Sequence, residues 1–306
     1  MKAEINNILH KCSKSINEIC AFRAMAEVFK KNPPTKAVFV EETHGGVGKV
    51  EFFSTTINDT IKREIADLLI IVNNKIQHEM RMSFMQAKIH KNGKGTPSKF
   101  LVDVFQYELL RNRPQITPLG SVAKKFPPDI LKDRGYKSIT SYGVFYFDNS
   151  DELDFLYTIP ESMNRILSWK PGITKNTKTR TYELLPIKSP SRIGFPPCKG
   201  TPYETICTYD IDQYEADIIN GYIGEPIRDP KIAYSLLQMV KNCTAKHEHK
   251  DLFEEMENAL SRVINDGGKG VDVPSIHENG RKEFEGNMNM LIINTDGFQS
   301  PEIQNR

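Results

Sequence analysis

The chain has 306 residues, of which 39% are hydrophobic and 26% are charged, and its formal net charge is +2. These values fit a globular protein with one large domain or two ordinary ones. No stretch approaches the roughly 18 apolar residues of a membrane-spanning helix, and the N-terminus lacks the apolar core of a signal peptide. Five cysteines without a C-x-x-C pair indicate reduced thiols. We therefore expect a cytoplasmic protein that has no membrane partner.

Positive charge is concentrated in the middle of the chain. Residues 81–192 contain 19 Lys and Arg side chains against 10 Asp and Glu, so the remainder carries a net charge of −7. Within this region, residues 81–99 have five basic side chains and no acid. Such asymmetry is typical of a surface that contacts a phosphate backbone, with an ordinary solvated surface as the competing interpretation. The residues that we expect to contact DNA are Lys91, Lys94, Lys99, Lys175, Lys178 and Arg180.

A helix and several strands are predicted in the first half of the chain. Residues 14–31 place apolar side chains on one helical stripe, which ends before Asn32-Pro33-Pro34. Further along, we expect Ser98 to cap a second helix, which Pro114 closes. The predicted elements are helices at 14–31 and 98–113 and strands at 36–42, 49–56, 65–72, 80–90 and 139–148.

A glycine-rich segment between the first two strands, THGGVGK at 43–49, invites comparison with the phosphate-binding loop of nucleotide hydrolases. That loop requires G-x-x-x-x-G-K-[ST] between a strand and a helix. Here Thr43 occupies the first glycine position and Val50 the hydroxyl position, and the following residues are β-branched or aromatic. We therefore predict strand, turn and strand, without a nucleotide site.

The second half has fewer clear patterns. Residues 170–205 are rich in Pro, Lys, Thr and Ser, which predicts long loops or an extended arm. Asp229-Pro230 is a typical helix start, with Asp as N-cap and Pro at the first helical position. The remaining predicted elements are helices at 231–242 and 251–265 and a final strand at 288–296.

The two strands at 65–72 and 80–90 carry the residues to which we assign chemistry. If they form an antiparallel hairpin with its loop centred near residues 76 and 77, Asp67 lies directly opposite Gln86. Lys88 falls on the same sheet face as Gln86, because side chains alternate along a strand. A carboxylate, an amide and an ammonium group then converge at one point, and a slip of one residue would scatter them.

This convergence suits metal-assisted hydrolysis of a phosphodiester. Mg²⁺ takes oxygen ligands, and usually only one or two of them are protein carboxylates. Asp67 would anchor the metal, and the Gln86 side-chain oxygen and the Ala87 carbonyl would be further ligands. Lys88 would orient the attacking water, or help to deprotonate it, and offset charge in the transition state. The competing interpretation is an ordinary sheet, with Asp67 paired to a lysine and Gln-Ala-Lys at an exposed edge.

The pattern over residues 14–112 resembles the PD-(D/E)xK nuclease superfamily. Asp67 lies on one predicted strand, Gln86-Ala87-Lys88 lies on the next, and an amphipathic helix follows. The acid that precedes x-K in the superfamily is glutamine here, as in the Q-x-K form of Mrr-like restriction nucleases, and one anionic ligand is thereby removed. The resemblance implies an α/β fold with a restriction-endonuclease-like mixed β-sheet core flanked by helices. It also implies a further acid upstream. The candidates for this acid are Glu51, which we include among the metal ligands, and Glu18, Glu27 and Glu64.

The resemblance and the basic region together predict a Mg²⁺-dependent endonuclease that cuts double-stranded DNA as a homodimer, with Mn²⁺ as a substitute metal. We expect residues 1–150 to form the nuclease core, and residues 151–306, an α+β half, to supply DNA recognition or dimer contacts. The resemblance implies a type II restriction or related defence nuclease. Two alternatives are a catalytically inactive nucleic-acid-binding module and an interaction subunit of a defence complex.

Overall fold

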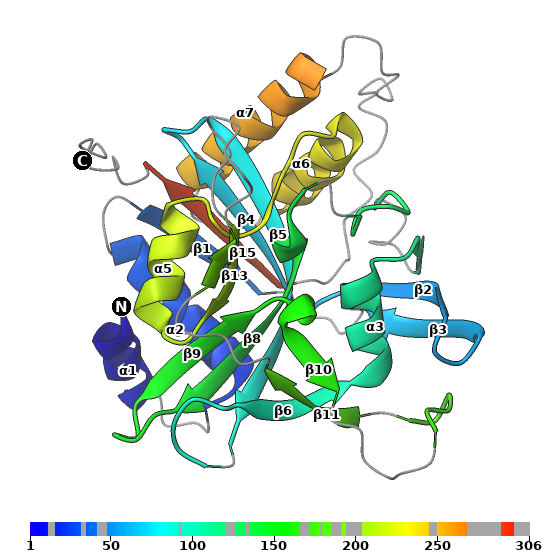
Figure 1. Cartoon of the computed structure of the whole chain (residues 1–306). Coiled ribbons are helices and arrows are strands. Elements are labelled where there is room, and N and C mark those ends of the chain that lie inside the picture. The colour runs from blue at the N-terminus through cyan, green and yellow to red at the C-terminus, as the bar shows by residue number, and fades with distance from the viewer. Residues whose placement is uncertain are drawn as a thin grey trace, which may run out of the picture.

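A mixed β-sheet forms the centre of the protein (Figure 1). The pairs β15–β4 and β5–β8 are parallel, whereas β1–β15, β4–β5 and β8–β9 are antiparallel. The expected α/β class with a mixed sheet is therefore confirmed. In sheet order the strands are β1 (Thr35–Val40), β15 (Asn289–Thr295), β4 (Leu68–Asn74), β5 (Glu79–His90), β8 (Thr140–Phe147), β9 (Leu153–Thr158), β13 (Glu204–Thr208) and β12 (Ser191–Ile193), and β14 (Glu225–Pro226) pairs with β5.

The structure is a computed structural model. It describes residues 1–11, 16–31, 35–41, 48–91, 93–119, 126–132, 135–165, 172–177, 179–184, 191–193, 204–244, 250–267 and 289–296.

The central strands are apolar because both faces of the sheet are covered. All seven residues of β4 are buried. Leu68 and Ile70 belong to one core cluster, whereas Leu69 and Ile71 belong to the cluster on the opposite face, as the alternation of side chains requires.

Helices cover both faces of the sheet (Figure 1). One core cluster joins the sheet to α1, α2 and α5, and the other joins it to α3, α6 and α7. None of the helices in the described part of the chain combines the length and the apolar character that a membrane crossing requires. The helices are α1 (Lys2–His10), α2 (Glu18–Lys31), α3 (Val104–Asn112), α5 (Ile211–Ile219), α6 (Pro230–Thr244) and α7 (Lys250–Gly267), with 3₁₀ turns η1 (Lys137–Ile139) and η2 (Pro160–Ser162).

Two small antiparallel sheets flank α3 (Figure 1). They belong to the core clusters on the same side of the central sheet as α3, α6 and α7. One consists of β3 (Asp59–Glu64), β2 (Lys49–Ser54) and β7 (Thr117–Pro118), and the other of β10 (Met163–Arg165), β11 (Thr179–Leu184) and β6 (Lys99–Asp103).

The helix expected over 98–113 is only half correct. Its first part is the strand β6, in which Phe100 and Val102 are buried while Leu101 is 61% exposed. This alternation with period two outweighs the helical spacing, because β11 pairs along the whole of β6. The helix α3 begins later, and Asp103 rather than Ser98 caps it by accepting hydrogen bonds from the backbone N–H groups of Phe105 and Gln106 at 3.0 and 2.9 Å.

Most other predicted elements are confirmed, with small shifts at their ends. The helices around 14–31, 231–242 and 251–265 correspond to α2, α6 and α7, and the predicted final strand corresponds to β15. The segment after Lys49 is the strand β2, as expected, and not the helix of a phosphate-binding loop. The sequence did not predict several elements. The longer ones are α1, α5, β3, β9 and β13, and the shorter ones are β7, β10, β14, the two 3₁₀ turns, and β11 and β12 within the region expected to be loops.

The central sheet is continuous across residue 150, the expected domain boundary. From the second half, β15 lies between β1 and β4, and β9 and β13 extend the sheet beyond β8. Residues after 150 therefore complete the sheet that carries the predicted site. Their assignment to DNA recognition or dimer contacts stays a prediction.

Candidate active site

The hairpin of β4 and β5 has the register that the sequence predicted. Leu68 pairs with Met85, and the ladder runs without a shift to Asn74 and Glu79. The backbone N–H of Asp67 donates at 3.1 Å to the carbonyl of Met85, the residue that already pairs with Leu68, so the regular ladder ends at Leu68. Asp67 directly precedes this end of the ladder, and its carboxylate meets the Gln86 side chain on the sheet face of α3, α6 and α7.

The predicted trio of side chains is brought together at this point. The Oδ2 atom of Asp67 accepts hydrogen bonds from the Gln86 Nε2 and, at 2.8 Å, from the Ala87 backbone N–H. The Lys88 Nζ lies 3.7 Å from the same oxygen. The Asp67 backbone carbonyl accepts a hydrogen bond from the Asn289 side chain of β15 at 3.2 Å. The carboxylate thus sits where three central strands meet.

The pKa of Asp67 is raised from 3.8 to about 6. Burial is the largest cause, and the charge of Lys88 and the hydrogen bond from Ala87 oppose it without cancelling it. Negative charge on Glu64 and Glu18 raises the pKa further. The carboxylate still reaches solvent, since 32% of the Asp67 side chain is exposed, as against 2% of Gln86. A carboxylate whose charge is poorly compensated at the edge of a water-accessible region favours an additional cation.

The chemistry of the donor set fits a hard divalent cation. The Oε1 atom of Gln86 is buried and has no hydrogen-bond partner among the described residues. A half-turn of the amide exchanges Oε1 and Nε2, and it would set an acceptor oxygen beside the Asp67 carboxylate. Two acceptor oxygens side by side repel each other unless a cation or a proton lies between them. However, no group of three or more His, Cys, Asp and Glu side chains in the described residues could hold a metal.

The four candidates for the upstream acid differ in their relation to Asp67. Glu64 and Glu18 are the acids whose charges act on Asp67. Glu51 lies on β2 in another sheet, where its Oε2 is 3.6 Å from the Lys62 Nζ of the neighbouring strand. Glu27 is exposed on α2. Among the four candidates, Glu64 and Glu18 therefore have an electrostatic link to the trio.

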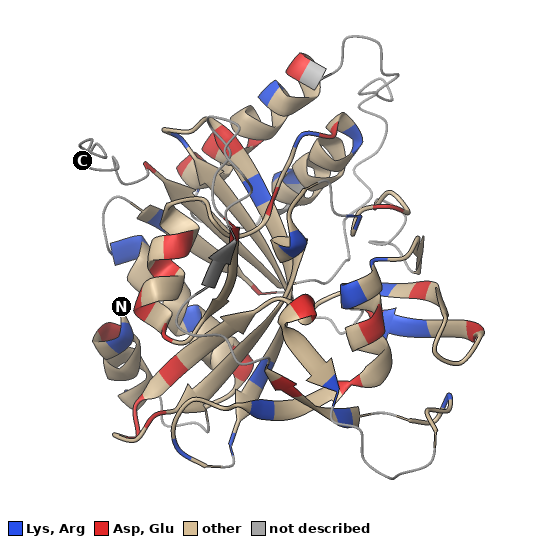
Figure 2. Ribbon diagram, in the orientation of Figure 1, with Lys and Arg blue, Asp and Glu red and all other residues tan. Residues whose placement is uncertain are grey.

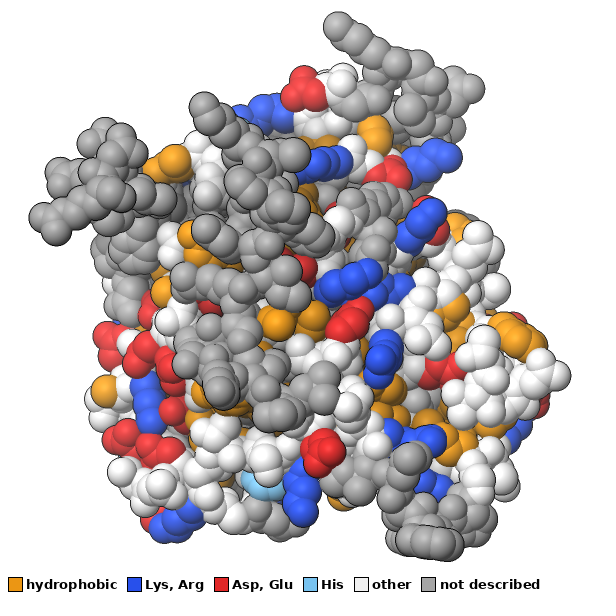
Figure 3. All heavy atoms as spheres, in the orientation of Figure 1, with side chains coloured by type: hydrophobic (Ala, Val, Ile, Leu, Met, Phe, Trp, Pro, Cys, Tyr) orange, Lys and Arg blue, Asp and Glu red, His pale blue; other side chains and the backbone are white. Residues whose placement is uncertain are grey.

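A basic groove lies next to Asp67. It has a volume of about 770 Å³, and Lys88, Lys91, Lys94 and Lys99 line it together with His90 and Leu101. No acid belongs to this lining in the described part of the chain. Lys and Arg positions recur along the loop before β6 and at the start of that strand (Figure 2). Figure 3 shows basic and acidic side chains interspersed over one face of the molecule, so the groove is a better candidate for phosphate contact than that face as a whole.

The other residues expected to contact DNA are dispersed. Lys94 lines the groove but also pairs with Asp151 at 2.5 Å, and Lys175 pairs with Asp59 of β3 at 2.8 Å. Arg180 donates to the Thr179 carbonyl at 3.0 Å. Lys178 lies outside the described residues. A role in DNA binding stays a prediction for all of them.

Sequence reasoning missed a tyrosine beside Gln86. Tyr142 of β8 is the parallel partner of Gln86, and its buried hydroxyl has no hydrogen-bond partner among the described residues. Burial and neighbouring negative charge, including that of Asp67, raise the pKa of Tyr142. The predicted strand 139–148 contained this residue, but no sequence signal paired that strand with β5. Leu101, which also lines the groove, was assigned only to the apolar stripe of the helix expected there.

Comparison with known proteins does not identify a family for this chain. No protein-family model matches the sequence, and no curated protein matches it. The function is therefore inferred from the site itself.

Proposed function

We propose that this protein is a metal-dependent DNA endonuclease with a restriction-endonuclease-like core. The observation that carries the proposal is the double position of Lys88, which lies 3.7 Å from the Asp67 Oδ2 and also lines the basic groove. A phosphate bound in that groove would meet an ammonium group beside a carboxylate that has an elevated pKa. Phosphodiester hydrolysis needs that combination of an anchoring acid and a cation at the scissile phosphate.

The oxygen donors for Mg²⁺ would be the carboxylate of Asp67, the Gln86 Oε1 after rotation of its amide, and the Ala87 carbonyl. The backbone N–H of Ala87 points toward the β4 side, since it donates to Asp67. The carbonyl of the same residue points the same way, because the N–H and C=O of one strand residue share a side. When bound, Mg²⁺ or Mn²⁺ would lower the pKa of a coordinated water and polarise the phosphoryl oxygen.

Lys88 would act beside Asp67, at the reacting phosphate. Its ammonium group would hold the water and offset the charge that develops on the phosphoryl oxygens. Asp67 must be deprotonated to receive a metal, so a pKa of about 6 makes the apo site half-protonated in weakly acidic solution. Lys91 and Lys99, both exposed, would bind the phosphates that flank the scissile one.

Plasmid cleavage tests this proposal directly. Supercoiled DNA is incubated with the protein and Mg²⁺, Mn²⁺ or EDTA, and wild type is compared with Asp67→Ala and Lys88→Ala. Cutting by wild type that requires the metal and is lost in both variants would support the proposal. Undiminished cutting by Asp67→Ala, or metal-independent cutting, would refute the site assignment.

A catalytically inactive nucleic-acid-binding module is the second candidate. The observation that favours it is the hydrogen-bond network around Asp67, in which a single oxygen already receives the Gln86 amide and the Ala87 N–H. Such a network can persist without any metal. Retarded migration of DNA without cutting in either metal would support this candidate, and neither effect would favour the interaction subunit of a larger complex.

We further propose that the enzyme acts on double-stranded DNA in the cytoplasm as a homodimer, in a restriction or other defence role. Two copies related by a twofold axis would present one site to each strand. Light scattering with and without a DNA duplex tests the dimer. A mass of one chain in both conditions would refute it.

A further inference from the structure

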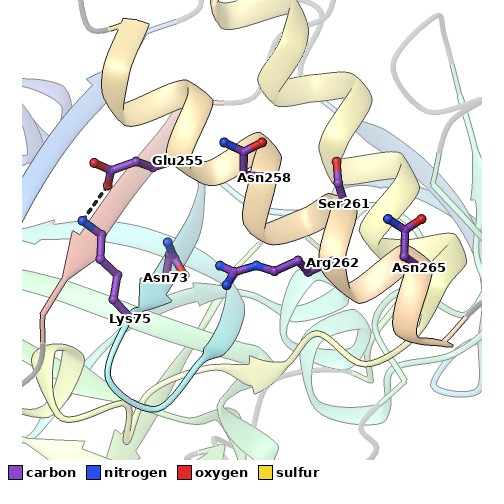
Figure 4. Close-up of a pocket in the computed structure, with 7 residues that line it drawn as sticks. All are labelled: Asn73, Lys75, Glu255, Asn258, Ser261, Arg262 and Asn265. Atoms are coloured by element: carbon purple, nitrogen blue, oxygen red, sulfur yellow. Dashed lines mark ion pairs between the residues drawn. The ribbon is translucent and has the colours of Figure 1, made fainter.

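A second cavity lies on the same face of the sheet as Asp67, at the opposite end of β4. Its volume is about 600 Å³, and it is an open pocket between the end of β4, the following turn and α7 (Figure 4). Asp67 and Asn73 are six residues apart along the chain, which is about 20 Å in an extended strand. The buried side chains of Leu69 and Ile71 separate them. The cavity is therefore distinct from the candidate active site.

Every residue that lines this cavity has a polar or charged side chain. Three are asparagines, two are basic, and the others are a glutamate and a serine. No aromatic or aliphatic residue lines the pocket in the described part of the chain, so it offers no ring on which an aromatic ligand would stack. The lining residues are Asn73, Lys75, Glu255, Asn258, Ser261, Arg262 and Asn265.

The negative charge at one end of the cavity is already compensated. The Glu255 carboxylate lies 2.7 Å from the Lys75 Nζ and 3.4 Å from the Lys36 Nζ, and it accepts a hydrogen bond from the Asn294 side chain at 2.8 Å. Burial alone would raise the pKa of Glu255, but Lys75 and Lys36 hold it below its ordinary value. Glu255 is thus ionised and bound within the protein.

Arg262, two turns further along α7, has no corresponding acid. Arg262 is exposed, and no hydrogen bond or ion pair joins its side chain to another described residue. In Figure 4 its guanidinium group extends from α7 toward Asn73. Five N–H donors in a fixed plane, left uncompensated at the mouth of a polar cavity, form a receptor for an oxyanion.

The asparagine beneath Arg262 also lacks a partner. Asn73 is only 3% exposed, yet its side-chain amide makes no hydrogen bond with another described residue. Its neighbour in the parallel ladder is Asn294, whose buried Oδ1 is likewise unpartnered in the described part of the chain. The Asn294 Oδ1 is fully buried, whereas the amide of Asn73 faces the pocket that it lines. Asn73 therefore offers both a donor and an acceptor to whatever occupies the cavity.

We propose that this cavity binds a small, hydroxyl-bearing phosphate monoester. The guanidinium of Arg262 binds the phosphate, and the amides of Asn73 and Asn258 bind the hydroxyl groups, since an amide can both donate to and accept from a hydroxyl. The polar lining favours a strongly hydrated ligand over a nucleobase. The proposal does not depend on the nuclease function.

Titration calorimetry with three probes tests the site: ribose 5-phosphate, inorganic phosphate and ribose. Ribose 5-phosphate is expected to bind more tightly than either fragment. Arg262→Ala should weaken its binding at least about tenfold, as the loss of a charge-assisted hydrogen bond implies. Asn73→Leu, which removes the amide at nearly constant volume, should weaken ribose 5-phosphate more than inorganic phosphate.

A control variant distinguishes binding at this pocket from non-specific attraction of the phosphate to positively charged side chains. Arg23→Ala removes one exposed arginine from α2, which covers the other face of the sheet, and should leave the affinity unchanged. Each variant is first checked by thermal unfolding. No heat of binding from any probe would overturn the proposal, and so would equal binding of phosphate and ribose 5-phosphate or equal weakening by Arg23→Ala.

Discussion

A carboxylate lies near each end of β4, and the pKa values of the two carboxylates are shifted in opposite directions. At one end, burial raises the pKa of Asp67 to about 6, and its one nearby ammonium group is 3.7 Å away. At the other end, Lys75 lies 2.7 Å from Glu255, and the pKa of Glu255 is lowered. Glu255 is closely paired with a lysine, so its charge is already compensated within the protein. Asp67 has no such close partner, so binding a further cation would stabilise its charge.

The largest effect is expected from Asp67→Asn. The substitution keeps the shape and removes the charge, so it should lower metal-dependent cleavage at least about 100-fold, as the loss of a principal electrostatic group does. DNA affinity should change little, because phosphate contacts dominate it. Cleavage and gel retardation on one duplex measure both quantities. Asp266→Asn, an exposed acid of α7, is the matched control; loss of cutting in both variants would contradict the assignment.

The pH dependence of stability should differ between wild type and Asp67→Asn. Between pH 3.8 and about 6 the unfolded chain releases the Asp67 proton while the folded protein retains it, so wild type loses stability as the pH rises. The loss is at most about 3 kcal/mol and is reduced by solvent at the partly exposed carboxylate. Urea unfolding at pH 4 and 7 without metal should show the variant more stable only at pH 7. A constant difference would count against the raised pKa.

Gln86→Glu places a second carboxylate beside Asp67, and so adds to the uncompensated negative charge at this end of β4. Without metal, the two carboxylates should repel each other and lower stability at neutral pH. With metal, the added anionic ligand should reduce the Mg²⁺ concentration needed for half-maximal cutting by roughly tenfold. A Mg²⁺ titration of the cleavage rate measures this. Complete inactivation would mean that Gln86 acts as a donor to Asp67 and not as a metal ligand.

Lys91→Gln and Lys99→Gln should each weaken DNA binding by a similar factor for all sequences. If each lysine contacts one phosphate, the slope of log K against log salt concentration should fall by about 1 per substitution. Fluorescence anisotropy between about 50 and 200 mM salt gives the slope. Lys241→Gln, on the exposed side of α6, is the control. An unchanged slope in both groove variants would exclude the groove as the phosphate contact.

The smallest effect is expected from Glu255→Gln. The ion pair with Lys75 is about one-third exposed on each side, so its loss should cost no more than about 1 kcal/mol. Because the pKa of Glu255 is lowered, this stability is present above its ordinary pKa of 4.5 and disappears as the pH falls. The direction is opposite to that of Asp67. Urea unfolding at pH 3.5 and 7 measures it, and a larger cost at pH 3.5 would contradict this interpretation.

The hairpin was predictable because its information is local. A dense apolar run, a polar turn and a second run fix the centre of the loop. The centre fixes the register of Leu68 with Met85, and this register brings the neighbouring Asp67 to the side chain of Gln86. The parallel neighbour of β5 was not predictable, because the pairing of Gln86 with Tyr142 spans 56 residues and leaves no periodic signal. The start of α3 was wrong for a related reason: the pairing of β6 with β11, far along the chain, overrides the helical spacing of its apolar residues.

The position of β15 has a consequence for how the protein is made. The strand that joins β1 to β4, and whose Asn289 anchors Asp67, is 222 residues further along the chain than that aspartate. A ribosome releases segments in order, so β1 and β4 leave it long before the strand that must lie between them. If the protein is the proposed nuclease, its candidate site would stay incomplete until β15 had left the ribosome.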